Sequence, residues 1–214
     1  MTRSRMCFVL VLGLLAACSS VELPVERYYR LQPSSAGTPD PMRAGILRVH
    51  DLQLGTALDS DRLLFQSGVT LEPRPLARWV APLDRLVTDA MVLGLSRARV
   101  CDLVKGSADS GVETWSLHGR IIDFVEAACD EGTTANVALE LWLQHGDDLV
   151  FHDEFRCTQP LGESGPEQAV VALSCGLNQI VGKVVAKMRE QDLFATAHRD
   201  KQERDAAKVA HPPR

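Results

Sequence analysis

Residues 135–157 read ANVALELWLQHGDDLVFHDEFRC, and the alternation in this stretch decides the class of fold. One face of a strand over 135–144 carries Val137, Leu139, Leu141 and Leu143, whereas the other carries Asn136, Glu140 and Gln144. A second strand over 149–157 alternates in the same way, and residues 145–148 (HGDD) form a tight connection. The pattern predicts two antiparallel strands that pack on one face and meet water on the other.

The surrounding sequence adds further strands and two helices. Strands are expected over 26–32, 46–52, 99–104 and 115–127, with a hairpin over 62–67 and 69–72 that turns at Gly68. Apolar residues recur at helical spacing from Trp79 to about Arg97, with Pro82 in the first turn. A second helix is expected after a capping box over 164–167, with an apolar stripe of Val170, Val171, Ser174, Leu177, Val181, Val184, Val185 and Met188. The prediction is an α+β fold: a mostly antiparallel sheet with two helices packed on one face.

The amino terminus has the features of a secretory signal. Two arginines precede the apolar run over 6–15, which is too short for a hydrocarbon core that needs about 20 residues. The pattern Leu15-Ala16-Ala17-Cys18 resembles the bacterial lipobox. The resemblance implies that residues 1–17 are removed and that Cys18 carries acyl chains such as palmitate, which anchor the protein. The alternative is an ordinary signal peptide with a structural cysteine at position 18.

The mature chain therefore divides into three expected parts. Residues 18–25 form a lipidated tether, 26–194 form one domain, and 195–214 are polar and charged and read as a disordered tail. Ser19 stands where an aspartate usually retains a lipoprotein in the inner membrane, so we expect an outer-membrane protein that faces the periplasm. Without residues 1–17 the chain has 21 Lys and Arg against 28 Asp and Glu, a formal net charge of −7. This charge argues against nucleic acid as a partner.

Four cysteines remain in the mature domain: Cys101, Cys129, Cys157 and Cys175. They allow three pairings, among which the sequence does not choose. We expect at least one disulfide in an oxidising compartment, and the alternative is four buried thiols. No two of them have the CxxC spacing, so a structural zinc site is not expected. We expect no cofactor and no other metal site.

The sequence does not predict an enzyme. Gly94-Leu95-Ser96 lacks the last glycine of a GxSxG nucleophile elbow. Asp123 and Glu126 lie three apart on a strand, so they point to opposite faces and cannot act as a carboxylate pair. The histidines that could serve as bases are His50, His118, His145 and His152. A Cys–His nucleophile stays open as an alternative.

Three short motifs resemble a known family, the ABC-type transport auxiliary lipoproteins (PqiC-like). The motifs are Tyr28-Tyr29-Arg30-Leu31, the stretch LDSDRLLF over 58–65 with Asp59 and Arg62, and Arg78-Trp79-Val80-Ala81-Pro82-Leu83. The similarity runs from about Cys18 to Met188 in order and spacing. We expect Trp79 to be mainly a packing residue, with an exposed interface anchor as the alternative.

The resemblance implies a role and no reaction. Members of the family are outer-membrane lipoproteins that work with an MCE-domain protein and an ABC transporter or related component to move lipids or other hydrophobic compounds between membranes. It also implies a possible homo-oligomer. The alternative function is a lipoprotein chaperone for another outer-membrane component.

Overall fold

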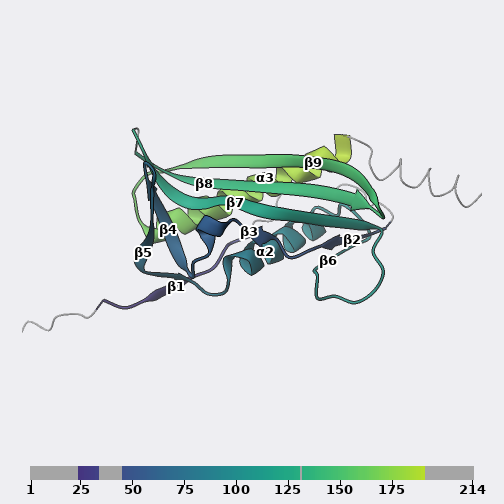
Figure 1. The fold of residues 1–214 in the computed structure, drawn as a ribbon, viewed down its shortest axis with the longest axis horizontal. Helices are drawn as coiled ribbons and strands as arrows, with labels where there is room; N and C mark the ends of the chain where they lie inside the picture. The colour runs from purple at the N-terminus through teal and green to yellow at the C-terminus, as the bar shows by residue number, and fades with distance from the viewer. Residues whose placement is uncertain (1–23, 34–44, 131, 191–214) are drawn as a thin grey trace, which may run out of the picture.

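A computed structural model describes residues 24–33, 45–130 and 132–190, which form one mixed sheet and two α-helices (Figure 1). The strands are β1 (Arg27–Tyr29), β2 (Ile46–Val49), β3 (Gln53–Leu54), β4 (Arg62–Ser67), β5 (Thr70–Trp79), β6 (Leu103–Lys105), β7 (Trp115–Cys129), β8 (Gly132–His145) and β9 (Asp148–Leu161). The helices are α2 (Leu83–Arg97) and α3 (Pro166–Glu190), and a short 3-10 turn, η2, covers Thr56–Leu58.

Strand β7 is the centre of the sheet. Along one edge it pairs antiparallel with β8, which pairs antiparallel with β9. Along its other edge lie three short strands, β2, β3 and β4, all parallel to it. Further pairs are β4–β5 antiparallel, with β1–β5 and β2–β6 parallel.

The sheet is therefore mixed, and the prediction of a mostly antiparallel sheet is wrong. Five of the eight strand pairs are parallel, although the long pairs are antiparallel. Alternation along a strand reports which face is buried, and it carries no information about the direction of a partner more than 50 residues away. The α+β class and the two helices agree with the sequence.

The hairpin of β8 and β9 is the predicted one. Its four inward leucine and valine side chains on β8 are at most 1% exposed. Gly146 has φ 58°, which suits the tight turn between the strands. The register shifts between Leu143 and Gln144, and Leu149 is 59% exposed instead of sharing the inward face with Phe151.

Helices α2 and α3 contact each other and pack on the same side of the sheet (Figure 1). They approach closely because Gly94 of α2 lies against Val181 of α3, and a Cβ at Gly94 would come within 2.8 Å of that valine. Gly176 brings α3 close to Val137 of β8 in the same way. The predicted packing of both helices on one face is observed.

Two details of the second helix differ from the sequence prediction. Ser164 and Glu167 do not form a capping box, because Ser164 Oγ donates to Glu126 and Glu167 accepts from Arg27. Val171 is 53% exposed, whereas the other residues of the predicted stripe are buried. A 24-residue part of α3 is long and apolar enough to cross a membrane, but 61% of its apolar window is buried inside the domain, as in a core helix.

The short strands also differ in their bounds. Strand β1 covers only Arg27–Tyr29, and the strand expected over 46–52 ends at Val49 as β2, with a separate short strand, β3, after it at Gln53–Leu54. Strand β6 begins at Leu103, since Arg99 has φ 51° and belongs to the turn after α2. Strand β5 extends to Trp79, which therefore ends a strand instead of opening the helix.

Candidate interaction sites

The family-motif residues come together on β1, β5 and β4. Tyr28 lies opposite Arg78, Tyr29 lies opposite Trp79, and Arg62 pairs with Arg78 from the other side. The hairpin of β4 and β5 and the distant strand β1, which follows the predicted tether, thus form one corner of the sheet.

Arg78 is the charged centre of this corner. Its guanidinium donates to Glu26 Oε1 at 2.9 Å and to Asp61 Oδ2, and its pKa is raised by the hydrogen bond to Glu26. Arg62 lies 3.9 Å from the same glutamate oxygen. Tyr28 is 63% exposed, and its hydroxyl donates to Glu26 at 3.4 Å. We call this group the Arg78 cluster.

The remaining motif residues are arranged around the cluster. Trp79 is 5% exposed and meets Phe124 edge-on, with 5.9 Å between ring centroids. Leu31 is buried, whereas Asp59 is exposed after η2. Pro82 directly precedes the first residue of α2. Trp79 thus lies in the core, where packing dominates its role.

A second ion-pair cluster lies inside the domain. The Arg74 guanidinium binds both carboxylate oxygens of Glu126, at 3.0 and 2.6 Å, and Ser164 Oγ donates to Glu126 at 2.8 Å. The side chain of Glu126 is only 2% exposed. Arg74 also lies over the ring of Phe65, 4.3 Å from its centroid. We call this group the Arg74 cluster; it joins β5, β7 and the segment before α3.

A bulge in β5 places Arg74. Arg62 pairs with Arg78 and Leu64 pairs with Pro73, so residues 74–77 stand opposite Leu63 alone. Within the bulge Leu76 has φ 59°, a conformation that is costly for a residue with a Cβ. The extra residues let Arg74 reach across to β7.

The sheet face opposite the helices carries a row of rings from the β2–β3 connection, β7, β8 and β9: His50, His118, Trp142 and His152. Neighbouring ring centroids are 4.0, 5.9 and 5.7 Å apart in that order. Burial lowers the pKa of both His50 and His118, and Arg48 lowers that of His50 further. His152 Nε2 lies 2.9 Å from Glu140 Oε1.

Two buried cations hold the loop between β6 and β7. Arg48, 9% exposed, donates to the carbonyls of Asp109 and Gly111, both at 2.7 Å, and to Glu113 at 2.9 Å. Lys105, 5% exposed, donates to the same carbonyl of Gly111 at 2.7 Å. The hydrogen bond from Arg48 lowers the pKa of Glu113. The loop over 106–113 has no strand or helix, yet these bonds fix its path.

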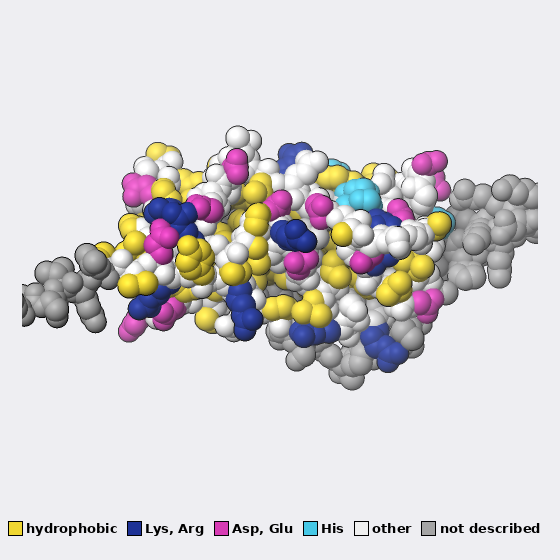
Figure 2. Space-filling model, turned by 90° about the horizontal axis from the view of Figure 1, so that it is seen from below, with side chains coloured by type: hydrophobic (Ala, Val, Ile, Leu, Met, Phe, Trp, Pro, Cys, Tyr) yellow, Lys and Arg dark blue, Asp and Glu magenta, His cyan; other side chains and the backbone are white. Residues whose placement is uncertain are grey.

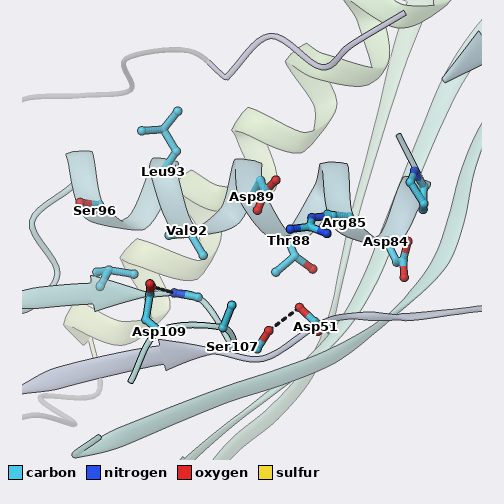
Figure 3. A pocket seen from close by; sticks show the side chains of 14 residues that line it. Asp51, Asp84, Arg85, Thr88, Asp89, Val92, Leu93, Ser96, Ser107 and Asp109 are labelled. Carbon is cyan, nitrogen blue, oxygen red and sulfur yellow. Dashed lines mark hydrogen bonds between the residues drawn. The ribbon is translucent and has the colours of Figure 1, made fainter. Parts of the chain in front are cut away.

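The same loop forms one wall of a cleft of about 640 Å³, and α2 forms the other (Figure 3). We call it the α2 cleft. Thr88 and Val92 point from the helix toward the loop, where Ser107 Oγ donates to Asp51 Oδ1 at 2.6 Å (Figure 3). The Gly106 N–H donates to Asp109 Oδ2 at 2.8 Å. Asp84, Arg85 and Asp89 supply further charges, and Leu93 is 38% exposed.

The family model for the ABC-type transport auxiliary lipoprotein component matches residues 29–185, which include most of the corner built by the motifs. The chain belongs to the ABC-type transport auxiliary lipoprotein family. No curated protein matches the sequence.

Solved structures share the fold of this auxiliary lipoprotein. Protein XCC0632 from Xanthomonas campestris, described as a DUF330 protein, has 18% identity and a TM-score of 0.66, over 82% of this chain and 99% of that one. An uncharacterised protein has 19% identity and a TM-score of 0.65, over 77% of this chain and 99% of its own. At these identities the likeness concerns the fold.

The two carboxylates considered for catalysis lie apart in the auxiliary lipoprotein, whereas three of the four candidate histidines, His50, His118 and His152, lie in the ring row. Asp123 stands opposite Ala138 and Glu126 opposite Ala135, so the two carboxylates lie on opposite faces, as predicted. Burial raises the pKa of Asp123, whereas Glu126 is paired with Arg74. Within the described ranges, no three His, Cys, Asp or Glu side chains are grouped so as to hold a metal ion.

All four cysteines of the domain are free thiols in the structure. Cys101 and Cys157 are buried, whereas Cys129 and Cys175 are exposed. Cys101 bonds the backbone of Leu47, which pairs with the first residue of β7, and Cys129 is the last residue of that strand. At about 3.3 Å per residue these ends lie on the order of 45 Å apart, far beyond disulfide reach. The predicted disulfide is not formed here, and Cys101–Cys129 is not an available pairing.

Sequence reasoning missed the buried charges. In the sequence nothing distinguishes Arg48, Arg74 and Lys105 from basic residues on the exposed face of a strand. Only the folded structure shows that they bind backbone carbonyls and a carboxylate. Cys18 with its lipobox, the signal over 1–17 and the tail over 195–214 lie outside the described residues, so their roles stay predictions.

Proposed function

We propose that this auxiliary lipoprotein is the outer-membrane component of an MCE-type system that moves lipids or other hydrophobic compounds between the two membranes. It is non-catalytic, it is anchored through acylated Cys18, and it docks an MCE-domain protein. The observation that carries the proposal is the family match over 29–185 directly downstream of a lipobox.

The length of the tether supports a docking role. Arg27, where β1 begins, lies nine positions after Cys18, and a chain extends at most about 3.6 Å per residue. The domain therefore starts no further than about 32 Å from its anchor. A body held this close does not bridge two membranes alone, so an elongated partner must reach it.

The structure offers surfaces for such a partner. The Arg78 cluster includes the start of the strand that follows the predicted tether, the ring row lies on the sheet face opposite the helices, and the α2 cleft lies between α2 and the loop after β6. Figure 2 views the molecule from below and shows acidic and basic side chains interspersed with apolar ones across the middle of the face, and histidine side chains toward its right half. Such a mixture of polar and apolar surface is also found at non-obligate interfaces.

Two measurements test the proposal in cells that express the full chain. Cys18→Ala should release the exported protein from the outer-membrane fraction, and Ser19→Ala is the matched control that should stay bound. Crosslinking in intact cells followed by purification of the wild type should recover an MCE-domain protein, and deletion should sensitise cells to lipophilic agents. If Cys18→Ala stays in the membrane fraction, Cys18 is not the anchor. If no MCE-domain protein is recovered, the chaperone alternative is favoured.

A further inference from the structure

Two hollows meet at the first turn of α3 and form one continuous surface. One hollow, of about 470 Å³, lies between the start of β1, the β5 bulge and α3, and the other, of about 400 Å³, lies between the end of β9 and α3. Glu167 and Gln168 line both hollows. The apolar lining includes Val25, Leu76, Leu161 and Val171. We call this surface the tether-end surface.

Apolar side chains on the tether-end surface are exposed to solvent. Val25 is 75% exposed and Val171 is 53% exposed. Leu76 lines the surface from a backbone with φ 59°, which is costly for a residue with a Cβ. Single exposed apolar residues are common on proteins, but a group of them around a hollow is typical of a protein or membrane interaction site.

The tether-end surface lies at one end of the long axis of the domain. Leu161 pairs with Thr133, which pairs with Ala128 near the end of β7, whereas the loop over 106–113 leads into the first residue of that strand. The 15 residues of β7 span on the order of 45 Å. Strand β1 and the start of α3 lie at the left end in Figure 1, and Figure 2 shows apolar side chains among charged ones at that end.

The distance to the predicted anchor indicates what covers this surface. Pro24 lines it and lies six positions after Cys18, so the chain between them spans at most about 22 Å. Acyl chains on Cys18 would therefore hold the surface close to the bilayer. Because the two are linked, the effective concentration of lipid at the surface is high, and a weak intrinsic affinity is enough for contact.

A second copy fits this position less well than lipid does. A copy inserted head to tail beneath the domain would separate the tether-end surface from the bilayer by a body on the order of 45 Å long. The chain from Cys18 to Pro24 does not cover that distance, since it spans at most about 22 Å.

The charges of the surface also suit a lipid interface. Arg27 pairs with Glu167 at 2.5 Å, so these two charges largely compensate each other and do not select an ionic partner. At a lipid interface, apolar side chains enter the boundary between headgroups and acyl chains while charged ones stay hydrated.

We propose that the tether-end surface rests on the phospholipid bilayer that holds the anchor, with Val25, Leu76 and Val171 at the boundary between headgroups and acyl chains. This inference rests on the proposed function, which supplies the acylated Cys18. The long axis of the domain then points away from the membrane, and the loop over 106–113 lies at the end that a partner from the periplasm reaches first.

Quenching of tryptophan fluorescence by brominated lipids tests the contact. The full acylated chain is reconstituted into vesicles of phosphatidylethanolamine and phosphatidylglycerol, with and without bromine on the acyl chains, and the emission of the wild type is subtracted. Val25→Trp and Val171→Trp should each lose at least about half of their added emission, because interfacial side chains lie about 5–10 Å deep, within reach of the bromines.

Two exposed positions at the opposite end provide matched controls. Val112 is 86% exposed in the loop before β7, and Leu149 is 59% exposed opposite Gln144, which pairs with Ser116. Val112→Trp and Leu149→Trp should not be quenched. Quenching at Val25 and Val171 should be equal in about 0.05 M and about 0.5 M salt, because the contact is apolar.

Three results would overturn the inference. The first is unquenched tryptophan at Val25 and Val171, and the second is equal quenching at Val112. The third is protection of Val25 that appears only when the ratio of protein to lipid is raised, which would mean that a second copy covers the surface.

The inference and the proposed function fail in different ways. If Cys18→Ala stays in the membrane fraction of cells, the proposed anchor fails, and this inference fails with it. If Cys18→Ala is released and Val25→Trp is not quenched in the acylated protein, the anchor stands and the tether-end surface does not contact lipid.

Discussion

Arg74 and Arg78 lie four residues apart on β5, and each binds a glutamate through its guanidinium. Their side chains are almost equally exposed, 24% and 25%. Their partners differ: Glu126 is 2% exposed, whereas Glu26 is 36% and Asp61 66% exposed. The burial of the carboxylate, and not of the arginine, therefore separates a core ion pair from a surface one.

The difference shows what each cluster does. Glu126 has lost its hydration and depends on Arg74 and Ser164 for compensation, so the Arg74 cluster holds three elements together. Glu26 and Asp61 keep much of their water, and the Arg78 cluster therefore contributes little to stability. The cluster with the family motifs is the weaker one energetically, which fits a surface role.

The largest expected effect is that of Arg74→Ala. The change leaves a buried carboxylate with only the Ser164 hydroxyl, and loss of one partner from a buried pair costs about 3–5 kcal/mol of unfolding free energy. Urea denaturation of the chain that begins at Ser19 measures it.

The double variant Arg74→Ala with Glu126→Gln sharpens this test. It removes the uncompensated charge and should recover a large part of the lost stability. Equal instability of the single and double variants would mean that Arg74 acts through packing on Phe65 instead.

A much smaller effect is expected for Arg78→Ala in the same assay. Its partners stay hydrated after the change, so the urea midpoint should remain close to that of the wild type, and the difference should shrink in about 0.5 M salt. A loss as large as that of Arg74→Ala, independent of salt, would contradict the comparison between the two clusters.

The last prediction concerns the reactivity of the thiols and involves no change in the stability of the fold. Burial raises the pKa of Cys101 to about 11, and its Sγ donates to the Leu103 carbonyl at 3.1 Å, whereas Cys129 is exposed. Since only the thiolate reacts, iodoacetamide at neutral pH should label Cys129 long before Cys101 in folded protein. Mass spectrometry of timed samples measures this order.

The unreduced, unfolded protein provides the second part of the thiol test. Cys101 and Cys129 should not be joined by a disulfide there, because the two lie too far apart to pair. A disulfide-linked peptide that joins Cys101 to Cys129 would contradict the placement of these cysteines at opposite ends of β7. A disulfide among the other cysteines stays a prediction.

Local patterns in the sequence predicted the parts of the fold that are made of neighbouring segments. The alternation over 135–157 predicted β8 and β9, because consecutive antiparallel strands need only a tight turn between them. Helical spacing predicted α2 and α3 and the face that each buries. The capping box predicted before α3 did not form, because the Ser164 hydroxyl donates a hydrogen bond to Glu126 in the folded protein.

The candidate sites were predicted only in part. The three family motifs contained Tyr28, Asp61, Arg62 and Arg78 of the Arg78 cluster but not Glu26, which binds the arginines, and their contact is a result of parallel β1 joining β5. No sequence signal marked the α2 cleft, because Asp51, Asp89 and Asp109 come from separate elements with ordinary surface composition.

The sequence by itself determined the hairpin of β8 and β9, the two core helices, the family and the expected anchor at Cys18. The tertiary structure alone decided that β2, β3 and β4 lie parallel to β7, that the β5 bulge brings Arg74 to Glu126, and that Arg48 fixes the loop of the cleft. The physical reason is one of range. Periodicity reports the environment of each side chain along a single element, whereas these contacts join residues more than 50 positions apart, and only packing and desolvation of the whole domain select them.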